Sequence, residues 1–204
     1  MKNTLYTIGH STHTADKLIA LLKEHDINAV VDVRSYPYSR MNQQFNREFF
    51  SDLLKEHGIL YVFLGKELGA RPEDPNIYID GKVKFDLLAQ TDIFKDGINR
   101  ILQGMDNYRI ALMCAEKDPL ACHRTILVCR NLADRGINIS HILEDGTLEN
   151  HSVAILRLLD ELNLKTNELF RKDNEIMDEA YSLRGEQIAY KKTESATNMI
   201  LREK

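Results

Sequence analysis

The sequence predicts an α/β protein with an open, mostly parallel five-stranded sheet, helices on both faces and a helical extension at the C-terminus. Two observations support this prediction. Short apolar runs rich in β-branched residues alternate with segments of helical periodicity, which is the pattern of a parallel sheet with crossover helices. The runs are also continuously apolar, as strands buried on both faces require. Strands are expected at 5–8, 29–33, 60–64, 110–113 and 137–142.

Helices are expected between the strands, at about 14–25, 46–57, 85–105 and 119–135. The last of these has clear boundary signals, because Asp118 suits an N-cap, Pro119 a first helical position and Gly136 a C-terminal cap. The segment 66–84 interrupts the alternation with glycines, prolines and charges. It is expected to form a lid or binding loop, or else a solvated surface excursion.

The chain is expected to divide into an α/β domain at 1–150 and a helical extension at 151–204. A first helix of the extension carries an apolar stripe that fits the edge of the sheet, and a second, highly charged helix carries a thinner one. The stripes consist of Val153, Leu156, Leu159 and Leu162, and of Leu169, Ile176, Ala180 and Leu183. The second helix is expected to be exposed or to associate with another copy of the chain, which makes a homo-oligomer one expected partner.

Composition limits the classes of partner and compartment. The formal net charge of −4, from 27 basic and 31 acidic residues, lacks the basic excess of a nucleic-acid-binding protein, so such a partner is not supported. Three cysteines and no charged-then-apolar leader favour a reducing, cytoplasmic setting. No apolar run approaches the roughly 20 residues that span a bilayer, so no membrane association is expected.

Polar residues accompany four of the five predicted strands, most of them where a strand ends. Because the carboxyl ends of parallel strands share one edge of a sheet, these side chains are expected to converge in a crevice there. The convergent groups are Gly9, His10 and Ser11, Asp32 and Arg34, Cys114 and Glu116, and His141.

The expected chemistry centres on Cys114. Backbone N–H groups, the start of a helix and Arg124 are expected to lower the pKa of this thiol. Glu116 and His10 are candidates for acid–base chemistry, and Asp32 is a further catalytic candidate whose alternative role is to orient Arg34 or His10. The alternative is that the thiol is inert and packed in the core.

Arginines predict that the substrate is a small anionic or nucleotide-like molecule. Arg34, Arg40 and Arg124 near a helix start suit a phosphate or carboxylate group. Gly9, Ser11, Cys122 and His123 complete the expected substrate-binding set. The alternative for Arg124 is a surface ion pair with Asp118 or Glu116, and Cys122 shares a helix face with the expected core residue Cys129.

A metal site is not expected, and the residues indicate no particular cofactor. Cys114, Cys122, His10, His123 and His141 are possible ligands, but the C-x7-C spacing matches no zinc pattern. Neighbouring Cys122 and His123 on a helix would also point in different directions. A Cys114–Cys122 redox pair would lack the C-x-x-C arrangement.

Six motifs follow one another along the chain: T-I-G-H-S at 7–11, D-V-R at 32–34 followed by Pro37, Ser39 and Arg40, L-G-A-R-P at 68–72, C-A-E at 114–116, C-H-R at 122–124 and H-I at 141–142. In this order they resemble the bacterial domain of unknown function family 488, from about residue 5 to residue 142. The resemblance implies a shared site and names no activity.

A weaker likeness is to rhodanese-type sulfurtransferases, in which an Asp-Val-Arg follows the second strand and a catalytic cysteine follows the fourth. Asp32-Val33-Arg34 and Cys114 hold comparable places, whereas Glu116 and Pro119 differ from the glycine-containing cradle of that family. Three functions are therefore considered. The first is an enzyme acting on a small anionic substrate, the second a non-catalytic ligand-binding or regulatory module, and the third sulfur transfer through Cys114.

Overall fold

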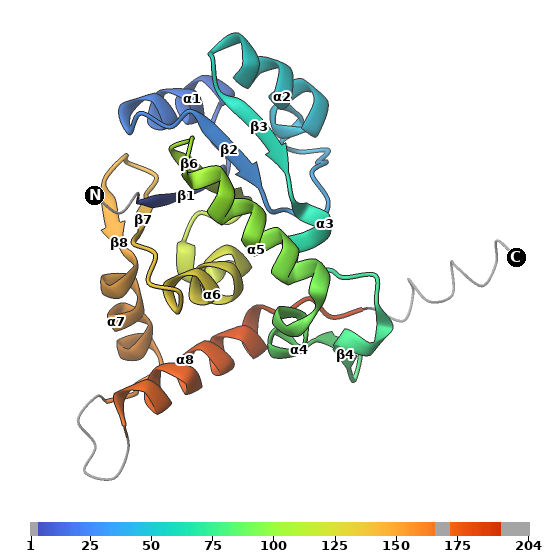
Figure 1. Cartoon of the computed structure of the whole chain (residues 1–204), viewed down its shortest axis with the longest axis vertical. Helices are drawn as coiled ribbons and strands as arrows, with labels where there is room; N and C mark the ends of the chain where they lie inside the picture. The colour runs from blue at the N-terminus through green and yellow to red at the C-terminus, as the bar shows by residue number, and fades with distance from the viewer. Residues whose placement is uncertain (1–3, 166–171, 193–204) are drawn as a thin grey trace, which may run out of the picture.

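A six-stranded sheet with the strand order β3-β2-β6-β1-β7-β8 forms the centre of the protein (Figure 1). The computed structural model describes residues 4–165 and 172–192. Strands β1 to β3, β6 and β7 run parallel, and β8 pairs antiparallel with β7. The strands are β1 (Leu5–Gly9), β2 (Ala29–Asp32), β3 (Leu60–Phe63), β6 (Ile110–Cys114), β7 (Ile139–Ile142) and β8 (Leu148–Asn150). The predicted fold class is confirmed, and β8 is an addition at the edge.

The helices between the strands are shorter and more interrupted than predicted. The α-helices are α1 (Ala15–Glu24), α2 (Arg47–Glu56), α3 (Gly65–Leu68), α4 (Phe85–Gln90), α5 (Asp92–Met105), α6 (Arg130–Ala133), α7 (His151–Glu161) and α8 (Asp173–Ile188). The 3-10 helices are η1 (Gln43–Phe45), η2 (Pro75–Ile77) and η3 (Pro119–Ala121), and η4 (Arg124–Cys129) is a π-helix. The expected helix at 85–105 is two helices, because the Thr91 side chain caps a new start by accepting from Phe94 N–H.

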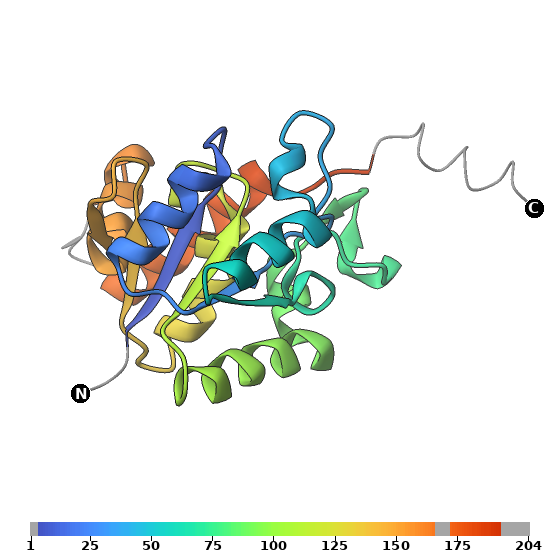
Figure 2. The same ribbon diagram turned by 90° about the horizontal axis from the view of Figure 1, so that it is seen from above.

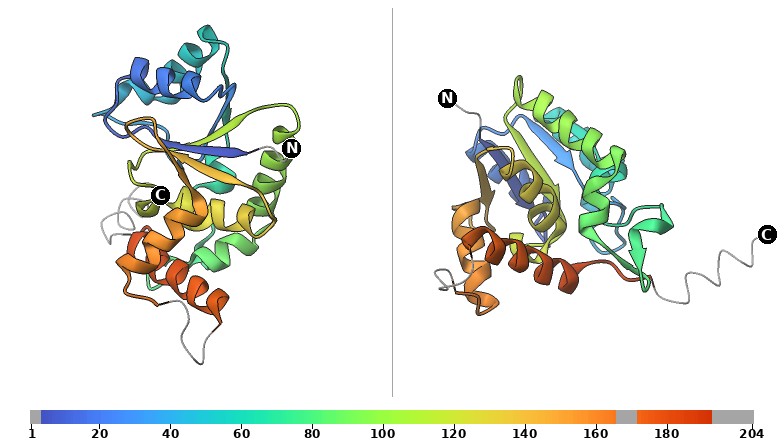
Figure 3. Two further views of the ribbon diagram at one scale, coloured as in Figure 1. Left: turned by 90° about the vertical axis from the view of Figure 1, so that its left-hand side faces the viewer. Right: turned by 60° about the horizontal axis from the view of Figure 1, so that its bottom comes forward.

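The sheet separates two apolar cores, because side chains alternate between its faces. Figures 2 and 3 show α1 and α2 on one side of the sheet and α5 on the other. On the first side, Ile8 and Val30 pack with Leu22 and Phe50, and all four side chains are buried. On the second side the core contains Leu5, Val31, Leu112, Leu68, Phe94, Ile98 and Leu127. Strands β1, β2 and β6 are therefore buried along their whole length, as their continuous apolar runs predict, whereas β3 at the edge of the sheet is partly exposed.

The segment 66–84 is an ordered excursion. It contains η2 and a hairpin of β4 (Tyr78–Ile79) and β5 (Lys82–Val83), whose turn places Asp80 at φ +51° and Gly81 at φ +74°. Two positive φ angles are the requirement of a type I′ hairpin turn. The Val83 N–H donates to Tyr190 O at 3.0 Å, so the C-terminal segment lies beside the hairpin.

The C-terminal helices pack on their own chain. In α7 the buried face contains Ala154, Ile155, Leu158 and Leu159, whereas Val153 and Leu156 of the predicted stripe are exposed. In α8, Ile176 and Ala180 are buried, Leu183 is exposed, and Leu169 lies outside the described residues. Self-association stays a prediction. Within the described ranges, no helix combines the length and the apolar character of a bilayer-spanning segment.

Candidate functional site

A pocket of about 390 Å³ opens at the carboxyl edge of the sheet, beyond the ends of β2 and β6. Of the residues predicted to form a site, Arg34, Cys114, Glu116 and His123 line it. The other lining residues are Ser35, Tyr36 and Tyr38, Ala70 and Arg71, Ala115, Ala121, and Ile188 and Tyr190. The pocket thus combines strand ends, the 66–84 excursion and the segment that follows α8.

Four potential ligating side chains meet at the base of this pocket. The Cys122 thiol donates to Glu116 Oε2 at 2.9 Å, and His123 Nδ1 lies 3.8 Å from Cys114 Sγ and 4.0 Å from Cys122 Sγ. The ligand atoms of Cys114, Glu116, Cys122 and His123 all lie within 4.8 Å of one another. We call these four residues the thiol cluster. His123 Nε2 donates to Val33 O at 3.0 Å, which orients the ring.

The convergence of Cys122 and His123 corrects the expectation that they diverge. That expectation assumed a continuous helix over 119–135, whereas the short helix η3 ends at Ala121 and the next residue, Cys122, is extended at φ −132° and ψ 139°. The π-helix η4 begins after His123. Because Cys122 is extended between two helical segments, its side chain does not follow the rotation from residue to residue in a helix. The side chains of Cys122 and His123 can therefore point to the same place. π-Helices are frequent at functional sites.

The charge of the cluster also differs from the expectation. The hydrogen bond with Cys122, together with burial, raises the pKa of the Cys114 thiol well above its usual value. Burial opposes ionisation of Cys122, but the hydrogen bond from Cys114 and the Arg124 guanidinium hold the pKa of Cys122 well below its usual value. Desolvation, followed by the nearby Cys122, raises the pKa of Glu116. The pKa of Cys122 is therefore shifted below that of Cys114, the reverse of the expected order.

Arg124 is fully buried and does not line the pocket. Its guanidinium donates to Glu116 O at 2.6 Å, to Lys117 O at 3.3 Å and to Thr7 Oγ1 at 3.4 Å. These bonds fix the loop that carries Glu116. Arg124 is therefore not at the surface, where the alternative of an ion pair with Asp118 or Glu116 placed it, and it contributes no side chain to the lining of the pocket.

Gly9 allows the same loop to pack closely against β1. A Cβ atom at this position would lie 1.9 Å from Glu116 O, which is far inside contact distance. The Ser11 N–H donates to Ala115 O at 2.9 Å, so the backbone pairing of β1 and β6 continues past the strand ends. Gly9 and Ser11 therefore position the loop and do not line the pocket.

Asp32, Arg34 and His10 form a buried network beside the pocket. Arg34 Nη2 donates to Asp32 Oδ2 at 2.6 Å and to Phe45 O at 2.8 Å, and Tyr61 Oη donates to Asp32 Oδ2 at 2.7 Å. Arg34 Nη1 donates to His10 Nε2 at 3.2 Å. Burial, followed by the charge of Arg34, lowers the pKa of His10 to about 4, so this histidine is neutral. Asp32 and His10 orient Arg34 and lie outside the pocket lining.

Two further predicted residues lie elsewhere. Arg40 is exposed and does not line the pocket. His141 is buried in β7, where its Nδ1 is 2.8 Å from Thr7 Oγ1 and its Nε2 is 3.1 Å from His151 Nδ1. The structure therefore brings the ends of β2 and β6 together and leaves β7 outside the pocket.

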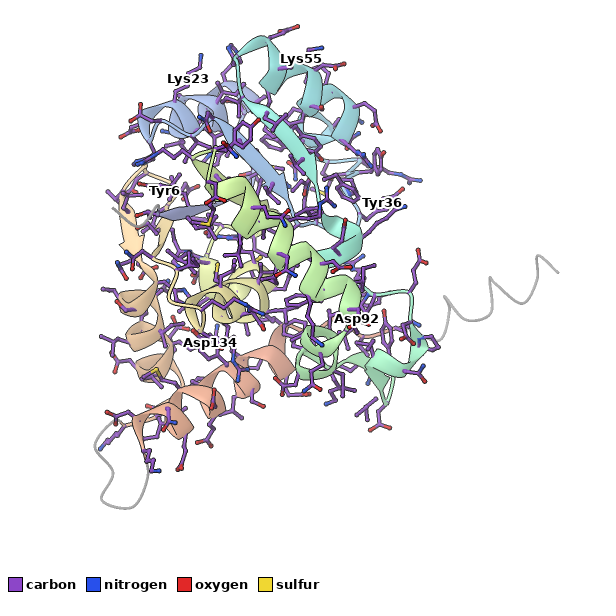
Figure 4. All side chains as sticks on the ribbon, in the orientation of Figure 1. Tyr6, Lys23, Tyr36, Lys55, Asp92 and Asp134 are labelled. Atoms are coloured by element: carbon purple, nitrogen blue, oxygen red, sulfur yellow. The ribbon has the colours of Figure 1, made fainter. Side chains whose placement is uncertain are left out.

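Four aromatic and basic residues of the pocket were not predicted. Tyr36, labelled in Figure 4, is 68% exposed, and its ring centroid lies 5.2 Å from that of Tyr38. The Arg71 guanidinium lies 4.5 Å from the ring centroid of Tyr190. Arg71 belongs to the L-G-A-R-P motif, which is a signal in the sequence. Tyr190 carries no local signal, because its place depends on how the chain returns after α8.

Comparisons with known proteins agree with the family resemblance. No curated protein and no solved structure matched the chain. A family model described as "Domain of unknown function DUF488" matches residues 14–130, a range that includes the thiol cluster and Arg71 but neither the T-I-G-H-S motif nor His141. Because this range is more than half of the chain, the protein belongs to the DUF488 family.

Proposed function

We propose that the protein is an enzyme that binds a small anionic or nucleotide-like substrate in the pocket and acts on it with Cys114, Glu116 and His123. One observation carries the proposal: these three reactive side chains line the same pocket as the guanidinium groups of Arg34 and Arg71. Titratable groups with shifted pKa values that converge in a cleft are typical of active sites.

Arg71 supports the anionic class of substrate. It is exposed and stacked on Tyr190, and it forms no ion pair with any carboxylate of the described residues. Arg34 lines the same pocket, but Asp32, Phe45 O and His10 already accept from most of its N–H groups. Arg71 is therefore the stronger anion-binding candidate, and Arg34 supplies a fixed positive charge behind it.

The tyrosines support a substrate with a planar ring. Tyr36 and Tyr38 are 68% and 40% exposed at the edge of the pocket, although tyrosine has a large apolar ring. Exposed aromatic rings beside a polar pocket offer a stacking surface. A nucleotide combines a planar base with the anionic group that Arg71 would bind.

The cluster supplies groups for proton transfer and nucleophilic attack. Glu116 is the candidate general acid, because it lines the pocket and desolvation, followed by the nearby Cys122, raises its pKa. Cys114 is the candidate nucleophile, since it lines the pocket, and His123 Nδ1, 3.8 Å from its sulfur, is the candidate acceptor of its proton. His10 contributes indirectly by orienting Arg34.

Binding is tested first, with inorganic phosphate, nucleoside 5′-monophosphates and the matching uncharged nucleosides as probes. Isothermal titration at constant ionic strength should detect the anions and not the nucleosides. Arg71→Gln should lower the affinity at least about tenfold, because a charge-assisted hydrogen bond is lost. Arg135→Gln is the matched control, since Arg135 is exposed and does not line the pocket. Equal affinities of wild type and Arg71→Gln would refute anion binding at this site.

Turnover is tested next, by mass spectrometry of each bound probe after incubation. Glu116→Gln and Cys114→Ser should abolish product formation and leave binding largely intact. Binding without turnover of any probe would favour the non-catalytic ligand-binding alternative. A labile persulfide on Cys114 after incubation with a sulfur donor, seen as added mass of the intact protein, would favour sulfur transfer.

A further inference from the structure

We propose that the thiol cluster, Cys114, Glu116, Cys122 and His123, binds one Zn²⁺ ion. The donor set itself indicates the metal. Two thiolates and an imidazole are soft to intermediate ligands that suit Zn²⁺, whereas Mg²⁺ and Ca²⁺ prefer sites made of oxygen atoms. Cys114 and Glu116 could not act as nucleophile and general acid while they hold the ion, so the site is distinct from the proposed chemistry, and the ion can be measured without any substrate.

The distances in the cluster fit one ion. A tetrahedral Zn²⁺ with bonds of about 2.3 Å to sulfur and about 2.0–2.2 Å to nitrogen and oxygen holds its donor atoms roughly 3.4–3.8 Å apart. The His123 Nδ1 atom lies 3.8 Å from Cys114 Sγ and 4.0 Å from Cys122 Sγ, and the Cys122 Sγ to Glu116 Oε2 distance is 2.9 Å. Shifts of less than about 1 Å would therefore complete the tetrahedron.

The surroundings of the cluster prepare its ligand atoms. His123 donates its Nε2 hydrogen to Val33 O at 3.0 Å, so Nδ1, the atom that faces the two sulfurs, is left with a free lone pair. A ligating histidine typically has such a second hydrogen bond, which fixes its tautomer and orientation. The Arg124 N–H donates to Cys122 Sγ at 3.4 Å, which stabilises negative charge on that sulfur.

The charge of Arg124 also favours negative charge in the cluster. This guanidinium is fully buried, and no carboxylate of the described residues forms an ion pair with it. A buried cation is normally compensated by a nearby negative charge. Two thiolates, one carboxylate and a Zn²⁺ ion together carry one negative charge, which would balance Arg124.

The position of the ion would make it part of the pocket. Cys114, Glu116 and His123 all line the pocket, and Cys122 lies behind them. A Zn²⁺ ion held by these residues would therefore be reached from the substrate side. With four protein ligands the site is closed, so Lewis-acid chemistry would require one ligand to leave, and Glu116 is the candidate because it is the most exposed of the four.

The test measures zinc on the full-length, reduced protein. After removal of metal with a chelator and addition of Zn²⁺, elemental analysis should find one zinc per chain. Cys122→Ser should lower the affinity for Zn²⁺ at least about 100-fold, more than loss of an outer hydrogen bond would. Cys129→Ser is the matched control, because Cys129 is also fully buried in the same segment but lies outside the cluster. The control should bind zinc like the wild type.

Two measurements keep the proposal testable if a variant fails to fold. In the wild type, Co²⁺ should give thiolate-to-cobalt charge-transfer bands and the intense visible bands of a tetrahedral site. Zinc should also protect Cys114 and Cys122 from alkylation, and the chelator should remove that protection. Absence of zinc binding, an unchanged affinity in Cys122→Ser, or a Co²⁺ spectrum without thiolate bands would overturn the proposal. Arg71→Gln should retain zinc, so loss of anion binding and loss of the metal site are distinguishable.

Discussion

Acid should destabilise the fold through the buried pair His141 and His151, because the hydrogen bonds around these residues leave no acceptor for an additional proton on either ring. Arg124 donates to Thr7, whose Oγ1 lies 2.8 Å from His141 Nδ1. His141 Nε2 is 3.1 Å from His151 Nδ1, and His151 Nε2 is 3.0 Å from Tyr181 Oη. With one proton on each ring, every contact in this chain pairs one donor with one acceptor.

The size of the effect follows from His151. Burial lowers the pKa of this residue from 6.5 to about 4, so the folded state keeps it neutral while the unfolded chain takes up a proton. Its contribution to stability is therefore complete above the unfolded pKa and is lost as the pH falls from 6.5 toward 4. Each unit is worth about 1.4 kcal/mol, which gives a maximum of about 3 kcal/mol and about 2 kcal/mol between pH ~7 and pH ~5.

Urea unfolding followed by circular dichroism, with a chelator present, measures this contribution. The free energy of unfolding of the wild type should fall between pH ~7 and pH ~5, and in His151→Gln that fall should be smaller by about 2 kcal/mol. His57→Gln is the control, because His57 is exposed and lies outside this hydrogen-bond chain. An equal fall in the wild type and His151→Gln would refute the assignment of acid sensitivity to this pair.

Three further substitutions should change stability, measured by urea unfolding at neutral pH. Gly9→Ala should lower the free energy of unfolding by about 1–3 kcal/mol, since its Cβ would overlap Glu116 O; a loss near zero would show that the loop can move. Arg124→Lys should cost about 2–4 kcal/mol, because an ammonium cannot reproduce the fork of hydrogen bonds in a buried site; wild-type stability would contradict the clamp. Phe50→Ala should cost about 3–5 kcal/mol, whereas exposed Phe49→Ala should stay within about 0.5 kcal/mol, and equal losses would contradict the assigned packing.

The sheet was predictable because its signal is local. The run Ala29–Val33 is apolar at each position except Asp32, and each of its residues is buried, so burial on both faces is visible in the sequence itself. Strand β8 lacks that signal. Its three residues, Leu148 to Asn150, include a glutamate and an asparagine and are stabilised by pairing with β7, which is a tertiary contact.

Part of the pocket was predictable because topology places it. Once the strands are known to be parallel, the residues after β2 and β6 must share an edge, and Arg34, Cys114 and Glu116 do line one pocket. The same argument placed His141 at that edge, but its side chain is directed into the buried chain of Thr7 and His151. Whether a strand-end side chain faces a crevice or the core depends on packing that residue order does not show.

The sequence does not predict the thiol cluster, because Cys122 and His123 lie at a break between two helices and not on one continuous helix. On a continuous α-helix, residues i and i+1 are rotated by about 100°, so Cys122 and His123 could not both approach Cys114. The boundary signals Asp118 and Pro119 do start a helix, but only the short 3-10 helix that ends at Ala121, just before Cys122. The extended backbone there is held by what surrounds it, since Arg124, the next helical residue, anchors the neighbouring loop through Glu116 O. The spacing of two potential ligands at a helix break can therefore be interpreted only when the tertiary contacts that hold the break are known.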